Sequence, residues 1–178
     1  MNRYPVIASL TSEEQIPQVL DSKLNRVNLM TGHIGKLEAI VNRLREADKQ
    51  VYVHVEMVAG LGKDKFAIAY LAERFRVDGI ITTKSNTVAA AKQAGLRSIQ
   101  RIFAIDTAAV QTAVRVIGSM HPDEVELMPG LMPRVIREMR EKISQPLIVG
   151  GLIRREEEIS AALESGADYI SCGDPSLW

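Results

Sequence analysis

Two consecutive glycines, Gly150 and Gly151, end an apolar run in the stretch PLIVGGLIRREEE. A strand that only has to pack and turn needs one glycine, so a pair suggests backbone N–H groups left bare for an approaching ligand. Ser171 and Gly173 end the next apolar run in a similar way. In parallel barrels, the loops after the last two strands commonly bind phosphate through such N–H groups. We therefore predict a phosphate cradle at these four residues.

Two cations could complete this cradle. Arg154 follows the glycine pair, and Lys84, with Ser85 beside it, follows an earlier apolar run. Both side chains can form charge-assisted hydrogen bonds with phosphate oxygens. A glycine pair at the end of a strand is also ordinary turn chemistry, which is the alternative interpretation of the motif.

Polar and charged residues alternate with apolar ones in three short runs. In VYVHVEM (51–57), RVNLM (26–30) and EVELM (124–128), every second residue is apolar. Side chains alternate across a strand, and a strand covered by helices turns its apolar face toward them. We expect the valines and leucines to face outward and the residues between them to face inward. The inward-facing set is Arg26, Asn28, Tyr52, His54, Glu56, Glu124 and Glu126.

A buried carboxylate without a partner is costly. Glu56, Glu126, His54 and Asn28 must therefore satisfy one another, pair with Arg101, or bind the hydroxyl groups of a ligand. A purely structural polar network that fills the interior is the alternative.

The elements that must position these residues alternate along the chain. Segments of helical spacing, such as Leu37, Ile40, Val41 and Leu44, separate the apolar runs. Alternating strands and helices form a parallel sheet. We predict eight strands, at residues 5–9, 26–30, 51–57, 77–83, 98–104, 124–128, 146–151 and 168–173.

Eight such units predict an α/β fold, a closed TIM-like (β/α)₈ barrel that spans residues 1–178 as one domain, with its site at the C-terminal ends of the strands. The 178 residues allow only short loops, since such barrels usually have roughly 250 residues. Only DPSLW follows the last strand, so the last helix is expected to be missing or minimal. A doubly wound open sheet is the main rival.

The composition narrows the class of protein. The 22 basic and 22 acidic side chains cancel, which disfavours broad, nonspecific binding to nucleic acid. No segment has the length or pattern of a membrane span or a secretion signal, so we expect a cytoplasmic protein. Cys172 is the only cysteine and the three histidines are scattered, so neither a disulfide, a metal nor another cofactor is expected.

A series of motifs runs in order from His54 to the C-terminus: HVEMVAGL, DGIITTKSN, AAKQAGL, IQRIFAIDT, ELMPGLMPRVI, GGLIRREEE, ALESGADYISC and LW. On these motifs the chain resembles the glycerol uptake operon antiterminator regulatory proteins. The first fifty residues fit more loosely, through TGHIGKLEAIV. Two positions depart from the family pattern: Glu56 stands in place of an Asp, and Lys84 in place of an Arg. Both keep their charge but change the reach of the side chain.

The resemblance implies a non-catalytic regulator that responds to glycerol 3-phosphate. It would bind the leader of an mRNA and prevent premature termination, so that glycerol-utilisation genes are expressed. The predicted cradle would hold the phosphate, and the polar interior would bind the glycerol hydroxyls, through Asn28, His54, Glu56, Arg101 and Glu126.

Three alternatives stay open. The pocket could belong to an enzyme for a phosphorylated three-carbon substrate, an isomerase or a glycerol-phosphate transferase, with His54, Glu56 and Glu126 as acid/base groups. Arg134, Arg137 and Arg140 could form a solvated helix flank or a stripe that faces RNA. A small barrel with one helix missing is also compatible with a homodimer.

Overall fold

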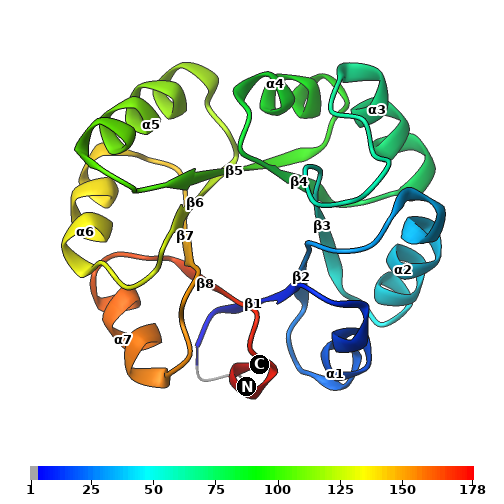
Figure 1. Cartoon of the computed structure of the whole chain (residues 1–178), viewed down its shortest axis with the longest axis horizontal. Helices are drawn as coiled ribbons and strands as arrows, with labels where there is room; N and C mark the ends of the chain where they lie inside the picture. The colour runs from blue at the N-terminus through cyan, green and yellow to red at the C-terminus, as the bar shows by residue number, and fades with distance from the viewer. Residues whose placement is uncertain (1–3) are drawn as a thin grey trace.

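The computed structural model describes residues 4–178, in which eight parallel strands form a closed barrel (Figure 1). Each strand pairs with the next along the chain, and β1 also pairs with β8, so the rival open sheet is wrong. The predicted barrel is confirmed. The strands are β1 (Val6–Leu10), β2 (Arg26–Leu29), β3 (Gln50–His54), β4 (Gly79–Thr82), β5 (Arg97–Phe103), β6 (Glu124–Met128), β7 (Leu147–Gly150) and β8 (Tyr169–Cys172).

Helices surround the barrel (Figure 1). They are α1 (Ile16–Asp21), α2 (Ile34–Glu46), α3 (Lys65–Tyr70), α4 (Ser85–Gln93), α5 (Thr107–Met120), α6 (Pro133–Lys142) and α7 (Glu156–Glu164). A short 3₁₀ turn, η1 (Glu13–Gln15), precedes α1, and a π-helical turn, η2 (Leu71–Phe75), extends α3. No helix within residues 4–178 is long and apolar enough to cross a membrane.

The chain after β8 forms only a 3₁₀ turn, η3 (Pro175–Leu177), as the short C-terminal sequence predicts. The indole N–H of Trp178 donates a hydrogen bond to the carbonyl of Cys172, 2.9 Å away. Trp178 also packs against the hydrophobic core. This single aromatic residue therefore helps to cover the part of the barrel where an eighth helix would lie.

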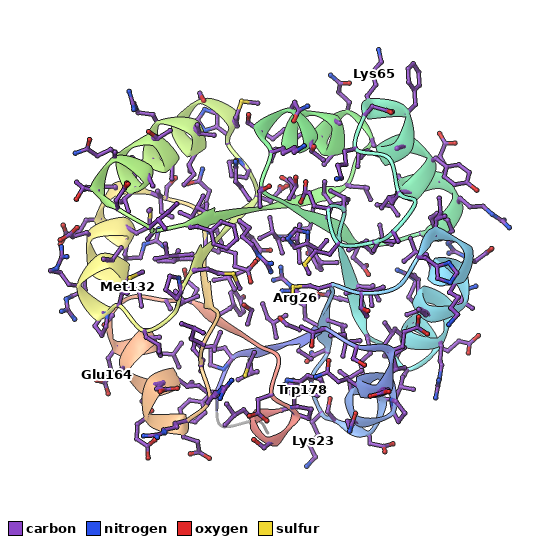
Figure 2. All side chains as sticks on the ribbon, in the orientation of Figure 1. Lys23, Arg26, Lys65, Met132, Glu164 and Trp178 are labelled. Atoms are coloured by element: carbon purple, nitrogen blue, oxygen red, sulfur yellow. The ribbon has the colours of Figure 1, made fainter. Side chains whose placement is uncertain are left out.

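The alternation of side chains sorts the core into two parts. The valines and leucines of β2, β3 and β6 belong to the large core between strands and helices, as predicted. Inside the barrel, a smaller apolar layer contains one residue from each of five strands. Side chains fill the ring, with Arg26 near its centre in projection (Figure 2). The inner apolar layer consists of Ile7, Tyr52, Ile81, Ile99 and Ile148.

This inner apolar layer divides the polar interior. On β5, Arg97 and Arg101 lie on either side of Ile99, and on β6, Glu124 precedes Glu126 by two residues. Arg97 pairs with Glu124 toward the N-terminal ends of the strands, whereas Arg101 pairs with Glu126 toward the C-terminal ends. The single polar interior expected from the sequence is therefore two clusters, one at each end of the barrel.

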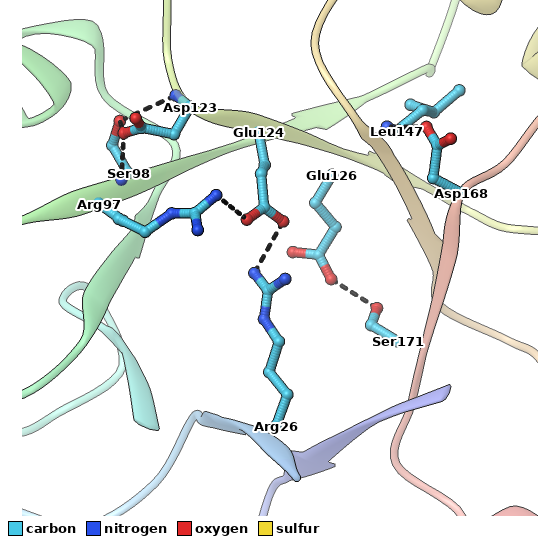
Figure 3. Close-up of polar contacts among 9 residues, drawn as sticks. All are labelled: Arg26, Arg97, Ser98, Asp123, Glu124, Glu126, Leu147, Asp168 and Ser171. Carbon is cyan, nitrogen blue, oxygen red and sulfur yellow. Dashed lines mark hydrogen bonds and ion pairs between the residues drawn. The ribbon is translucent and has the colours of Figure 1, made fainter. Parts of the chain in front are cut away.

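Three aspartates clamp neighbouring strands at their N-terminal ends. Asp78, Asp123 and Asp168 each stand immediately before β4, β6 or β8. In each case the carboxylate accepts the backbone N–H at or near the start of the preceding strand, at distances of 2.7–2.8 Å. Figure 3 draws two of these contacts, Asp123 with Ser98 and Asp168 with Leu147. The clamps therefore join β3 to β4, β5 to β6 and β7 to β8.

The arginines of α6 make structural contacts. Arg140 forms an ion pair with Asp168 at 3.0 Å, and Arg137 donates to the hydroxyl of Ser165 at 3.2 Å. Arg134 pairs with Glu138 one helical turn later. Two of the three arginines thus tie α6 to the segment before β8, which accounts for their spacing without a nucleic-acid partner.

Replacing Asp123 with Ala should lower the free energy of unfolding by about 1–3 kcal/mol, because the backbone N–H of Ser98 loses its acceptor. Asp123→Asn keeps an acceptor oxygen and should lose less. Urea denaturation measures both. Asp21→Ala, at an exposed position on α1, is the control and should change stability by at most about 0.5 kcal/mol. A loss for Asp123→Ala no larger than that of the control would contradict the clamp.

Candidate functional site

A buried ion pair lies at the C-terminal mouth of the barrel. The guanidinium of Arg101 donates from Nε to Oε2 of Glu126 at 2.7 Å, and both side chains are almost fully buried. The hydroxyl of Ser171 donates to the other carboxylate oxygen of Glu126 at 2.5 Å, a contact drawn in Figure 3. The Nη2 group of Arg101 also lies 3.0 Å from the sulfur of Met30. Both oxygens of Glu126 are therefore occupied, and of the three alternatives for the interior carboxylates Glu126 takes the pairing with Arg101.

Other polar side chains beside this pair have atoms without partners. Asn28 is fully buried, yet neither its amide nitrogen nor its amide oxygen has a hydrogen-bond partner in the described part of the chain. The same holds for the hydroxyl of Ser9, which lies opposite Asn28 in the pairing of β1 with β2, and for Nδ1 of His54. Unpaired buried polar groups are unusual in proteins. Their presence at the mouth marks a place where a polar ligand could bind.

His54 is uncharged at neutral pH. Burial, and secondarily the positive charge of Arg101, lower the pKa of this imidazole to about 4. Its Nδ1 lies 3.2 Å from a carboxylate oxygen of Glu56, without the geometry of a hydrogen bond. A neutral imidazole offers one donor and one acceptor, both of which suit a hydroxyl group.

Glu56 connects this interior to the loop after β4. Its carboxylate accepts the hydroxyl of Thr82 at 2.5 Å and the backbone N–H of Thr83 at 3.3 Å. The backbone N–H of Lys84 in turn donates to the Thr82 hydroxyl at 3.1 Å. The carboxylate of Glu56 thus holds the segment that carries Lys84.

The two glycines of β7 and its loop have separate structural reasons. A Cβ atom on residue 150 would lie 1.9 Å from the hydroxyl oxygen of Ser171, so the bond between Ser171 and Glu126 leaves room only for Gly150. Gly151 has a φ of +79°, a left-handed conformation that favours glycine. Its carbonyl accepts the backbone N–H of Gly130 at 3.0 Å, which joins the loops after β6 and β7.

The remaining cradle residues lie around the rim. Gly173 is exposed, and its carbonyl accepts a hydrogen bond from the side chain of Gln15. Lys84 and Arg154 are exposed as well, and β5 and β6 separate the strands that precede them. Glu158 already accepts the backbone N–H groups of Arg154 and of the next residue. The structure therefore gathers the polar interior but leaves the two cations apart on the rim.

Sequence reasoning missed several contributors to the mouth. Ser9 stands two residues after inward-facing Ile7, so alternation along VIASL could have identified it. Met30 continues the inward alternation of Arg26 and Asn28 and could have been identified as well. Thr82 could not, because it alternates with inward-facing Ile81 and its role depends on its contact with Glu56.

The sequence model of the glycerol-3-phosphate responsive antiterminators matches residues 6–178. The chain belongs to this family. The match covers all eight strands, including those that carry Asn28, His54, Arg101 and Glu126.

Two solved structures from the same group are closely similar. The glycerol uptake operon antiterminator regulatory protein of Listeria monocytogenes is 32% identical, with a TM-score of 0.94, over 100% of this chain and 96% of that one. A glycerol uptake operon antiterminator-related protein of Thermotoga maritima is 30% identical, with a TM-score of 0.87, over 98% of each chain. The uncharacterized protein YgcP of Escherichia coli is 30% identical over 100% of this chain and 93% of its own length.

The lowered pKa of His54 predicts a dependence of stability on pH. Below pH ~6.5 the unfolded chain protonates this imidazole, whereas the folded protein does so only near pH 4. Stability is therefore lost as the pH falls through this window, by up to about 3 kcal/mol from this group.

Urea denaturation at pH 7 and pH 4.5 measures this effect. His54→Gln should flatten the dependence, while His33→Gln, at an exposed position, should leave it unchanged. The same pH dependence in His54→Gln as in the unmodified protein would contradict the assignment.

Proposed function

We propose that this protein binds glycerol 3-phosphate at the C-terminal mouth of its barrel and, in that state, binds the leader of an mRNA. The bound protein would prevent premature termination and so allow glycerol-utilisation genes to be expressed. Membership of the glycerol-3-phosphate responsive antiterminators supports this proposal. In this proposal the protein acts as a regulator rather than a catalyst, with glycerol 3-phosphate as its effector and no further cofactor.

The observation that carries the proposal is the group of unpaired polar atoms at the mouth. Asn28 offers a donor and an acceptor, and Ser9 and His54 add a hydroxyl and a ring nitrogen. Leaving a buried polar group unpaired costs about 1–3 kcal/mol. A ligand with vicinal hydroxyl groups would recover part of this cost for several groups at once, which favours a glycerol moiety over an apolar one.

The phosphate would bind at the rim, over the loop of Gly150 and Gly151. The hydroxyl of Ser171 is already bonded to Glu126, and Glu158 accepts two N–H groups before α7. The phosphate contacts would therefore come from the backbone around the glycines and Gly173, and from the side chains of Lys84 and Arg154.

Glu56 would link ligand binding in the barrel interior to the position of the loop that carries Lys84 at the rim of the mouth. Its carboxylate lies beside His54 and holds the start of the loop that carries Lys84. We propose that the ligand draws the loops after β4 and β7 together, so that Lys84 and Arg154 close over the phosphate. This closure would order the mouth and complete the surface that binds RNA.

Calorimetric titration with glycerol 3-phosphate, beside glycerol and inorganic phosphate, tests the effector site. We expect selective binding of glycerol 3-phosphate, weakened roughly tenfold or more in Asn28→Leu, because the hydroxyl contacts are lost. The apo form of this variant should be as stable as the unmodified protein or more so, since an unpaired buried amide has been removed.

Gln100→Leu is the matched control. Gln100 is also buried with an unpaired oxygen, but it alternates with inward-facing Arg101 on β5 and so faces the helices. Its glycerol 3-phosphate affinity should match that of the unmodified protein. Equal affinities in Asn28→Leu and Gln100→Leu would argue against the site. Turnover of triose phosphates, abolished by Glu126→Gln, would favour an enzyme instead.

Affinity measurements with a leader RNA that contains a terminator hairpin, with and without glycerol 3-phosphate, test the proposed RNA binding. We expect glycerol 3-phosphate to tighten RNA binding by about tenfold, a typical coupling between two sites. The affinity should fall with increasing salt, because phosphate contacts release counterions. Lys84→Gln should reduce the ligand effect. RNA binding that is the same with and without ligand would refute the coupling.

A further inference from the structure

A polar cavity lies at the opposite, N-terminal end of the barrel. It has a volume of about 510 Å³, and the starts of several strands line it. Arg26 and Arg97 converge on the carboxylate of Glu124 from different strands, as Figure 3 shows. The distances are 2.8 Å from Arg26 and 3.0 Å from Arg97. Volumes of this order are typical of sites for small molecules.

The cavity has an excess of positive charge. Three cations, Lys23, Arg26 and Arg97, line it with one carboxylate, that of Glu124, and the other lining residues are uncharged. Three positive charges and one negative charge leave a net charge of +2. A single buried carboxylate therefore does not balance the cations around it.

Arg26 has donor atoms that Glu124 does not satisfy. Its Nε and Nη2 atoms are buried without a hydrogen-bond partner in residues 4–178. Nη2 forms an ion pair with Glu124 at 2.8 Å that lacks hydrogen-bond geometry. The guanidinium lies over the ring of Tyr52, 4.1 Å from its centroid, and 5.8 Å from that of Tyr169. The two rings hold the guanidinium in place while its N–H groups remain available for an oxyanion.

The loop that carries Lys23 is also held firmly. Lys49 is buried, and its ammonium group donates to the carbonyls of Ser22 and Leu24 at 2.8 and 2.7 Å. These two carbonyls flank Lys23 in the sequence, so the backbone at the edge of the cavity is preorganised.

We propose that this cavity is a second binding site, for a small dianion such as a phosphate or a dicarboxylate. A dianion matches the net charge of +2, and its oxygens can accept the unpaired N–H groups of Arg26. The inner apolar layer, which includes Ile99 and Tyr52, separates the cavity from the polar cluster at the mouth. The site therefore works independently of the glycerol 3-phosphate site.

Titration calorimetry with succinate, and separately with inorganic phosphate, tests this site. Glycerol 3-phosphate is left out of both arms, because its own phosphate could enter the cavity, and the Arg97 variant distinguishes this cavity from the mouth. Arg97→Gln should weaken binding of the dianion by about tenfold, because a charge-assisted hydrogen bond is lost. Arg97 is 59% exposed, so the variant is expected to fold. Arg43→Gln on α2, which removes an exposed charge outside the cavity, should bind as the unmodified protein does.

Thermal denaturation distinguishes a role of Arg97 in binding the dianion from a purely structural role. Succinate or phosphate should raise the melting temperatures of the unmodified protein and of Arg43→Gln. The increase for Arg97→Gln should be much smaller. Equal affinities in all three proteins, or no binding of either anion, would overturn the proposal. Binding of one anion but not the other would support it and identify the class of ligand. Because succinate lacks the glycerol moiety, failure of glycerol 3-phosphate binding at the mouth would not alter this result.

Discussion

The carboxylate of Glu126 is buried inside the barrel, and the arrangement of the mouth depends on how it is satisfied. Arg101 and Ser171 occupy its two oxygens, and a buried ion pair that loses one partner destabilises a protein by about 3–5 kcal/mol. The Ser171 hydroxyl then takes the space where a side chain at position 150 would lie. One buried charge thus determines the rotamers of its neighbours and the glycine of the adjacent strand.

Most of the architecture could be predicted from the sequence, because alternation and strand count have direct physical causes. Period-two patterns in β2, β3 and β6 placed the valines outside and the polar set inside. The division of that set into two clusters was not predictable, since it depends on the register and tilt of strands distant in sequence. Arg97 and Arg101 lie four residues apart on β5, and only the register with β6 shows that they meet Glu124 and Glu126, respectively.

The reason for the glycine pair, Gly150 and Gly151, could not be predicted from the sequence either. The sequence indicates that both positions need small residues but does not distinguish access for a ligand from internal packing. Gly150 is explained by Ser171, which is brought beside it only by the pairing of β7 with β8. Gly151 is explained by its left-handed backbone. Their part in phosphate binding stays a prediction, as does that of Lys84 and Arg154.

The aspartate clamps tie six of the eight strands together in pairs. The clamped pairs are β3 with β4, β5 with β6, and β7 with β8. At the start of β1, the N–H of Val6 bonds to the carbonyl of Tyr4, and the carbonyl of Pro5 accepts the N–H of Ile170 on β8. Local opening in proteins follows such cooperative units. The three clamped pairs should therefore exchange their amide hydrogens as blocks, with the two strands of each pair opening together.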